Sequence, residues 1–241
     1  MNATAEKTVR ELALESSTAP RVFEQFGLDY CCGGNRPLSD ACRAANVSMD
    51  DVLDALESAA LSAQKIDSNR TWTTEPLSEL IAHINATHHK YTRSEIARIS
   101  PLMDKVAAKH GANHPELIEI HATFQSLAQE LTTHLMKEEM VLFPYVIRME
   151  EAIIAHEPVL PPPFGTIQNP VSMMEHEHDS AGDALRVMRK ASRDYTPPAD
   201  ACVTYQTLYK GLAELEADLH QHIHLENNIL FPRATEMEKR H

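Results

Sequence analysis

Two stretches of the chain share one pattern. Residues 134–144 read His-Leu-Met-Lys-Glu-Glu-Met-Val-Leu-Phe-Pro, and residues 222–232 read His-Ile-His-Leu-Glu-Asn-Asn-Ile-Leu-Phe-Pro. Both stretches read His-x-x-x-Glu-x-x-x-Leu-Phe-Pro. On an α-helix, side chains four positions apart project from the same face. Each stretch therefore presents one imidazole and one carboxylate in a common direction. These side chains are His134, Glu138, His222 and Glu226.

Leucines that precede each histidine at helical spacing set that direction, because apolar residues three or four apart form the buried stripe of a helix. They are Leu127, Leu131, Leu215 and Leu219. The stripe predicts that both His–Glu pairs face the core. Burying a carboxylate beside an imidazole costs free energy unless a cation compensates the charge. The repeated pattern therefore predicts a metal site.

The composition predicts an all-α protein. The chain has 241 residues, of which 43% are apolar, 24% charged and only 5% aromatic, and it contains only 7 glycines. Good helix formers dominate, and no run alternates β-branched with polar residues as a strand would. This length accommodates one sizeable domain and a small one.

The charge and hydropathy pattern argues against a nucleic-acid or membrane partner. The net charge is −13 with histidine neutral, which opposes binding to phosphate backbones. No apolar run approaches the roughly 18 residues that a membrane span needs, and the N-terminus lacks a signal-peptide pattern. Four cysteines, two of them adjacent, do not form a secreted disulfide framework. We therefore expect a cytoplasmic protein.

Breaks in the helical pattern predict two domains. Residues 1–65 form a small helical domain with a Cys-Cys motif, residues 66–75 a polar linker, and residues 76–241 an antiparallel four-helix bundle. The four long helical patterns lie at about residues 76–110, 115–155, 170–195 and 199–238. Short breaks join the first pair and the second pair, and a proline-rich segment crosses between them.

The two hairpins of the bundle resemble copies of each other, which predicts one more histidine on the first helix of each. His178 precedes His222 by 44 residues, and His89 precedes His134 by 45. His178 lies in register with an apolar seam. In the first hairpin, His88 continues the upstream apolar stripe, whereas His89 matches the repeat distance. We choose His89, and spacing alone leaves His88 open.

The predicted donor set contains four imidazole nitrogens and two carboxylates. A structural zinc site normally uses four ligands, and often cysteine, so six duplicated donors exceed what one zinc ion needs. Imidazole suits iron, zinc, copper and nickel, while a carboxylate can bridge two metals. Two metal ions, each with two histidines and bridged by both carboxylates, would use every donor. Two iron ions in a carboxylate-bridged, non-haem centre fit best.

At this point the residues resemble a known family. The second unit is similar to hemerythrin-like domains, and the motifs Glu-His-Glu-His-Asp at residues 175–179 and Asp-Tyr-Cys-Cys-Gly-Gly at residues 29–34 resemble the bacterial repair-of-iron-centres family. The resemblance implies a di-iron stress-response protein that restores iron–sulfur clusters damaged by nitric oxide or oxidants. The ligands it implies are the residues already selected: His89, His134, Glu138, His178, His222 and Glu226.

Four further residues are candidates for supporting roles. Glu130 lies one turn before a predicted ligand and Glu177 beside another, where either carboxylate could orient an imidazole or shuttle protons or iron. Cys31 and Cys32 are either two ordinary thiols next to a turn or a redox or iron-relay pair.

The function predicted from these patterns is repair of iron–sulfur clusters through the supply of labile iron. Damaged iron–sulfur proteins would be the clients, and nitric oxide or oxygen the small ligands. Two alternatives use the same centre: a nitric oxide reductase, or a sensor that binds nitric oxide or oxygen without turnover. The oligomeric state, including a homodimer, stays open at this point.

Overall fold

The computed structural model describes residues 6–16, 18–30, 33–63 and 72–240. Within these ranges the chain is helical and forms no β-strand, and an isolated bridge joins Thr8 and Pro37. The prediction of an all-α protein is confirmed. Cys31 and Cys32 lie outside the described residues, as does most of the predicted linker, so the predicted domain boundaries stay a prediction.

Four short helices make up the N-terminal part. They are α1 (Val9–Glu15), α2 (Ala19–Gln25), α3 (Leu38–Ala45) and α4 (Met49–Ala63). A capping box opens α1, because Thr8 accepts from the backbone N–H of Glu11 while the Glu11 side chain accepts from that of Thr8. Leu12, Phe23 and Leu38 are fully buried in a core that these helices form among themselves. The N-terminal part therefore has its own hydrophobic core.

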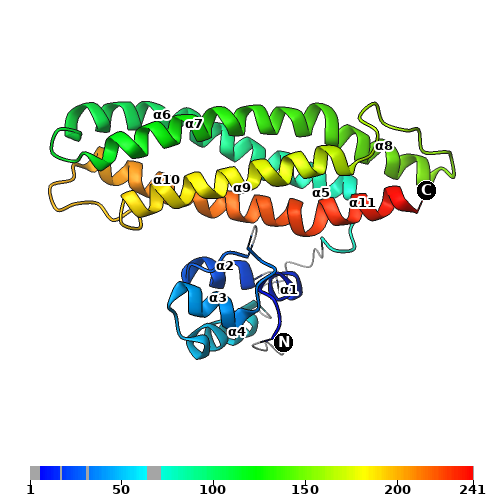
Figure 1. The fold of residues 1–241 in the computed structure, drawn as a ribbon, viewed down its shortest axis with the longest axis horizontal. Coiled ribbons are helices and arrows are strands. Elements are labelled where there is room, and N and C mark those ends of the chain that lie inside the picture. The colour runs from blue at the N-terminus through cyan, green and yellow to red at the C-terminus, as the bar shows by residue number, and fades with distance from the viewer. Residues whose placement is uncertain (1–5, 17, 31–32, 64–71, 241) are drawn as a thin grey trace. The chain divides into compact units, whose positions relative to one another are not determined.

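The rest of the chain forms long helices, several of them interrupted by single π-helical turns. The α-helices are α5 (Leu77–Ile84), α6 (Lys90–His110), α7 (Glu116–Lys137), α8 (Phe143–Ile154), α9 (Gln168–Ala191), α10 (Val203–Leu225) and α11 (Phe231–Lys239). The π-helical turns are η1 (Asn85–His89), η2 (Glu138–Leu142) and η3 (Glu226–Leu230). Figure 1 shows α6, α7, α9 and α10 lying along one common axis, with α6 and α9 running opposite to α7 and α10.

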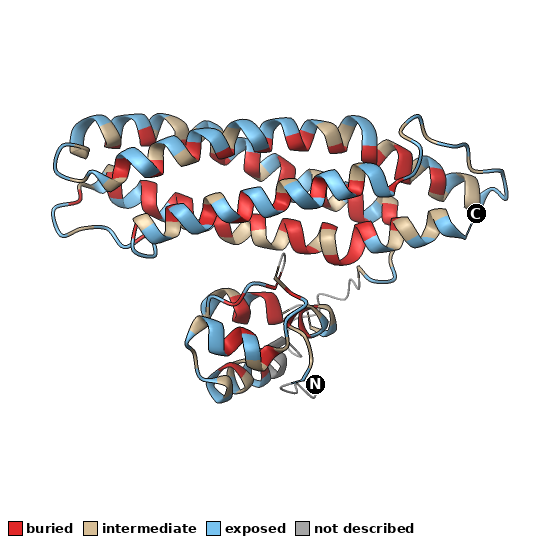
Figure 2. Ribbon diagram, viewed as in Figure 1, coloured by how far each residue is buried: buried red, intermediate tan, exposed pale blue. Residues whose placement is uncertain are grey.

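The core of this bundle combines residues from α6, α7, α9 and α10. Met103, Phe124, Leu185 and Leu212 are each at most 1% exposed, and Figure 2 shows the buried positions of these helices in a stripe along each one. The four predicted helices are confirmed with small changes at their ends. The last begins at Val203, because the residues before it form a turn in which the N–H of Ala201 bonds the Pro198 carbonyl.

Two of the π-helical turns, η2 and η3, coincide with the repeated Leu-Phe-Pro. In η2 the N–H of Phe143 bonds the carbonyl of Glu138, five residues back, and Pro144 follows directly. The N–H of Phe231 bonds the carbonyl of Glu226 in the same way. Proline has no N–H for a carbonyl four residues back, and the wider turn before it lets the helix restart there. The turns η2 and η3 each begin at one of the two predicted glutamate ligands.

Among the described residues, no helix is both long enough and apolar enough to span a bilayer.

Candidate metal centre

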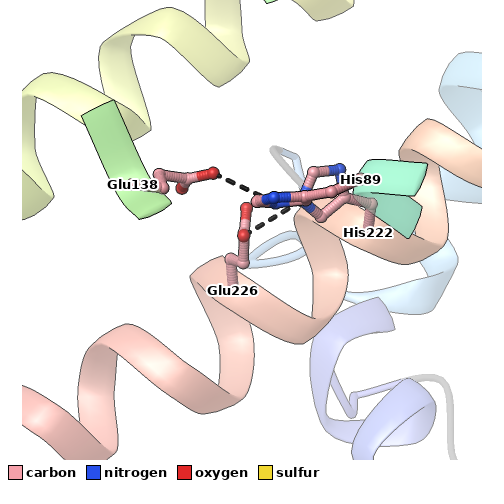
Figure 3. Close-up of side chains that lie close together, drawn as sticks. All are labelled: His89, Glu138, His222 and Glu226. Atoms are coloured by element: carbon pink, nitrogen blue, oxygen red, sulfur yellow. Dashed lines mark hydrogen bonds and ion pairs between the residues drawn. The ribbon is translucent and has the colours of Figure 1, made fainter. Parts of the chain in front are cut away.

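The structure brings the six predicted ligands together as two groups of four donors. In each group the donor atoms all lie within 4.8 Å of one another, and every residue is buried. Figure 3 shows the first group as side chains converging from separate segments. The first group is His89, Glu138, His222 and Glu226, and the second is His134, Glu138, His178 and Glu226.

The two carboxylates belong to both groups. Glu138 is fully buried, and its Oε2 lies 3.4 Å from Nε2 of His89 and 3.4 Å from Nε2 of His134. Glu226 is likewise fully buried, and its Oε1 lies 3.0 Å from Nε2 of His222. Because one carboxylate faces imidazoles of both groups, it is placed as a bridging ligand would be.

Another contact in the cluster joins two imidazoles. Nε2 of His178 lies 3.1 Å from Nε2 of His134, and both rings are buried. Two nitrogen lone pairs this close repel each other unless one nitrogen carries a proton or both face a cation. The arrangement suits a metal ion that both nitrogens would bind.

The structure separates His89 from its neighbour His88. His89 belongs to the first donor group, whereas His88 turns to another part of the bundle, where its Nδ1 lies 3.0 Å from Oδ1 of Asp218. The widened turn η1 ends at His89. Helical spacing alone could not choose between the two histidines, because that turn shifts the register of the residues around it.

The two candidate supporting carboxylates have different surroundings. Glu177 accepts a hydrogen bond from Nδ1 of His134 at 2.9 Å and pairs with Lys137. Partial burial acts to raise the pKa of Glu177, but these two hydrogen bonds outweigh burial and lower the pKa below its usual value. Glu130 is exposed and accepts instead from the hydroxyl of Ser126 at 2.8 Å.

A further carboxylate at the site was missed at the sequence level. Oε1 of Glu139 lies 2.8 Å from Nδ1 of His89, and Arg93 also bonds this carboxylate. Burial acts to raise the pKa of Glu139, but the hydrogen bonds from Arg93 and His89 outweigh burial and lower the pKa below its usual value. Arg93 follows His89 by four residues, and this helical spacing was the signal available in the sequence.

The donor set fits a pair of transition-metal ions. It offers four neutral nitrogen donors and two anionic oxygen donors, with no cysteine among the described groups. Imidazole and carboxylate together suit iron better than calcium or magnesium, which prefer oxygen ligands throughout. Two fully buried carboxylates also require positive charge nearby. Metal binding is therefore the chemistry that this cluster supports.

Comparison with known proteins agrees with the fold and the site. Residues 80–234 match the family described as Hemerythrin HHE cation binding domain. Residues 5–60 match a second family, ScdA_N, described as a domain of unknown function. The first match contains all six residues of the donor groups.

Relatives match over almost the whole chain. Proteins named "Iron-sulfur cluster repair protein YtfE" from Edwardsiella ictaluri and Cronobacter sakazakii are each 38% identical, over 95% of this chain and 96% of theirs. One with the same name from Escherichia coli O81 is 38% identical over 93% of this chain and 94% of its own. The chain therefore belongs to this family of iron–sulfur cluster repair proteins with an ScdA_N and a hemerythrin domain.

Proposed function

We propose that this protein repairs damaged iron–sulfur clusters and that its cluster of histidines and glutamates holds two iron ions. The six ligands would be His89, His134, Glu138, His178, His222 and Glu226. The observation that carries the proposal is the sharing of both carboxylates by two four-donor groups. One metal ion would need only one such group, whereas two ions use both.

The protein's own side chains prepare this site in three ways. The imidazoles present Nε2 toward the cluster, and Nδ1 of His89 and His134 bonds a carboxylate outside it. Burial excludes water, which strengthens attraction between the carboxylates and a cation. Glu138 and Glu226 supply the negative charge. When bound, two iron ions would supply redox chemistry and a store of iron for rebuilding a cluster.

The names of the relatives suggest the partners. Repair of clusters requires damaged iron–sulfur proteins as clients, and the proposal includes nitric oxide or oxygen as small ligands of the centre. The cytoplasm, where we expected the protein, is the compartment proposed for this activity. A homodimer stays a prediction, as does a relay role for Cys31 and Cys32.

A transfer experiment tests the proposed function. The protein would be loaded with ⁵⁷Fe without oxygen and mixed with an iron–sulfur enzyme whose cluster nitric oxide has damaged. We expect enzyme activity to return together with ⁵⁷Fe in the rebuilt cluster, by Mössbauer spectroscopy. The matched control is the Glu138→Ala variant, which should not restore activity because it lacks one shared ligand.

Two results would contradict the proposal. One is recovery of the enzyme without ⁵⁷Fe in its cluster. The other is catalytic formation of nitrous oxide from nitric oxide and an electron donor with no recovery of the enzyme, which would favour the reductase alternative.

A further inference from the structure

We infer that Glu139, held in place by Arg93, positions the imidazole of His89 for metal binding. The inference rests on the proposed function, because it concerns how that centre is assembled. It assigns a role to two residues outside the donor groups, on the side of the bundle where α6 and η2 meet.

Arg93 fixes the Glu139 carboxylate through both of its oxygens. Nη1 donates to Oε1 at 2.8 Å, and Nη2 donates to Oε2 at 3.0 Å. Two parallel hydrogen bonds between a planar guanidinium and a carboxylate define the orientation of both groups. Arg93 is 44% and Glu139 32% exposed, so the pair lies at the rim of the bundle rather than in the cluster.

The fixed carboxylate then favours one tautomer of the His89 imidazole. Oε1 lies 2.8 Å from Nδ1, so the carboxylate favours a proton on that nitrogen. The lone pair of Nε2 is then directed at the cluster, where Nε2 lies 3.4 Å from Glu138. Phe143 stacks on the ring with a centroid distance of 5.5 Å and an interplanar angle of 23°. The Glu139 carboxylate and the Phe143 ring together restrict the orientation of the imidazole.

The second donor group contains an equivalent arrangement. His134 bonds Glu177, which pairs with the cation of Lys137. Each group therefore has one imidazole held by a carboxylate that a surface cation holds in turn. The two arrangements use different helices and different cations, so each donor group has its own means of orienting one imidazole.

An iron-release experiment tests the role of Glu139. The wild-type protein and variants would be loaded with ferrous iron without oxygen, and iron loss to a chelator would be followed by absorbance. Removing a carboxylate that orients a metal-binding histidine typically weakens metal binding about 10- to 100-fold. We expect Glu139→Gln to release iron faster by about this factor. Arg93→Gln should give a smaller increase, because the carboxylate remains.

Controls separate positioning from a general loss of structure. Asp183 and Arg186 form an exposed carboxylate–arginine pair on α9, and neither residue belongs to a donor group. Asp183→Asn should release iron at the wild-type rate. Melting of the metal-free Glu139→Gln variant should match that of metal-free wild type, and Glu139→Asp should recover part of the wild-type release rate.

The double variant tests whether Arg93 acts through Glu139. Adding Arg93→Gln to Glu139→Gln should change the release rate no further. If the two substitutions instead multiplied each other's effect on the release rate, Arg93 would not act through Glu139. If the Glu139→Gln variant released iron at the wild-type rate, the role of Glu139 would be overturned, but the proposed iron site would still stand. A wild-type protein that binds no iron would instead overturn the proposed function itself.

Discussion

Single residues decide how many metal ions this site can hold. Glu138 contributes to both donor groups, whereas His178 contributes to only one. The Glu138→Ala variant is therefore expected to lose both ions, because each group falls to three donors and one of the two shared carboxylates is gone. His178→Ala should weaken one ion only. Iron analysis after gel filtration distinguishes the two results.

The control for this pair is Glu119→Ala, an exposed carboxylate in the first turn of α7. It should keep the wild-type iron content. Equal losses in Glu138→Ala and His178→Ala would contradict the bridging role of Glu138.

Cys202, which precedes α10, lies in surroundings that favour its thiolate. Backbone N–H groups of Tyr205 and Thr204 and the His110 ring, with Nε2 3.2 Å from Sγ, lower the pKa of this thiol to about 7. Because the thiolate is the reactive form, alkylation of Cys202 should accelerate as pH rises through about 7. Cys42 is buried and its pKa is raised, so it is the internal control.

Peptide mass spectrometry of the alkylated native protein measures both cysteines at once. The His110→Gln variant should move the Cys202 midpoint to higher pH, because it removes a hydrogen-bond partner of the thiolate. Equal rates at Cys202 and Cys42 would contradict this account.

Among the helical elements, the π-helical turns η2 and η3 set the position of the two carboxylate donors. Glu138 opens η2, and the extra residue of that turn fixes its angle relative to α8. Deleting the half-exposed Val141 should restore a regular α-helix and rotate Glu138 relative to α8 by about 100°. We expect the variant to keep its helical circular dichroism and lose iron. Val141→Ala, which keeps the turn, should retain both.

The helices could be predicted from the sequence, but these turns could not. Apolar residues at helical spacing and the breaks after His110 and Tyr195 are enough to predict four long helices. A π turn differs from an α turn by one residue and one hydrogen bond, so it barely changes that spacing. His88 and His89 show the consequence, because η1 determines which of these two neighbouring histidines faces the donor groups.

Metal binding should stabilise the whole fold. The donors come from the four helical segments around α6, α7, α9 and α10, and a ligand bound only by the folded state adds about 2.7 kcal/mol at 100 times its dissociation constant. Removing iron with a chelator should therefore lower the unfolding temperature measured by calorimetry. Glu138→Ala should unfold at the same temperature with and without iron.

Residues far apart in sequence complete the site, and this limits what a sequence can predict. The repeated His-x-x-x-Glu predicted the cluster because each pair is local to one helix. Glu139 and Arg93 were missed because a rim ion pair looks like any other surface charge until the fold places it beside His89. The reactive environment of Cys202 likewise depends on His110, which is 92 residues away.

The iron content of protein purified without oxygen decides whether the cluster of histidines and glutamates is a site for two iron ions. Mössbauer spectroscopy combined with metal analysis should show about two coupled iron ions per chain, one for each of the two donor groups that share both carboxylates. The His134→Ala/His222→Ala variant should lose them. One iron per chain, zinc alone, or iron retained by that variant would contradict the account.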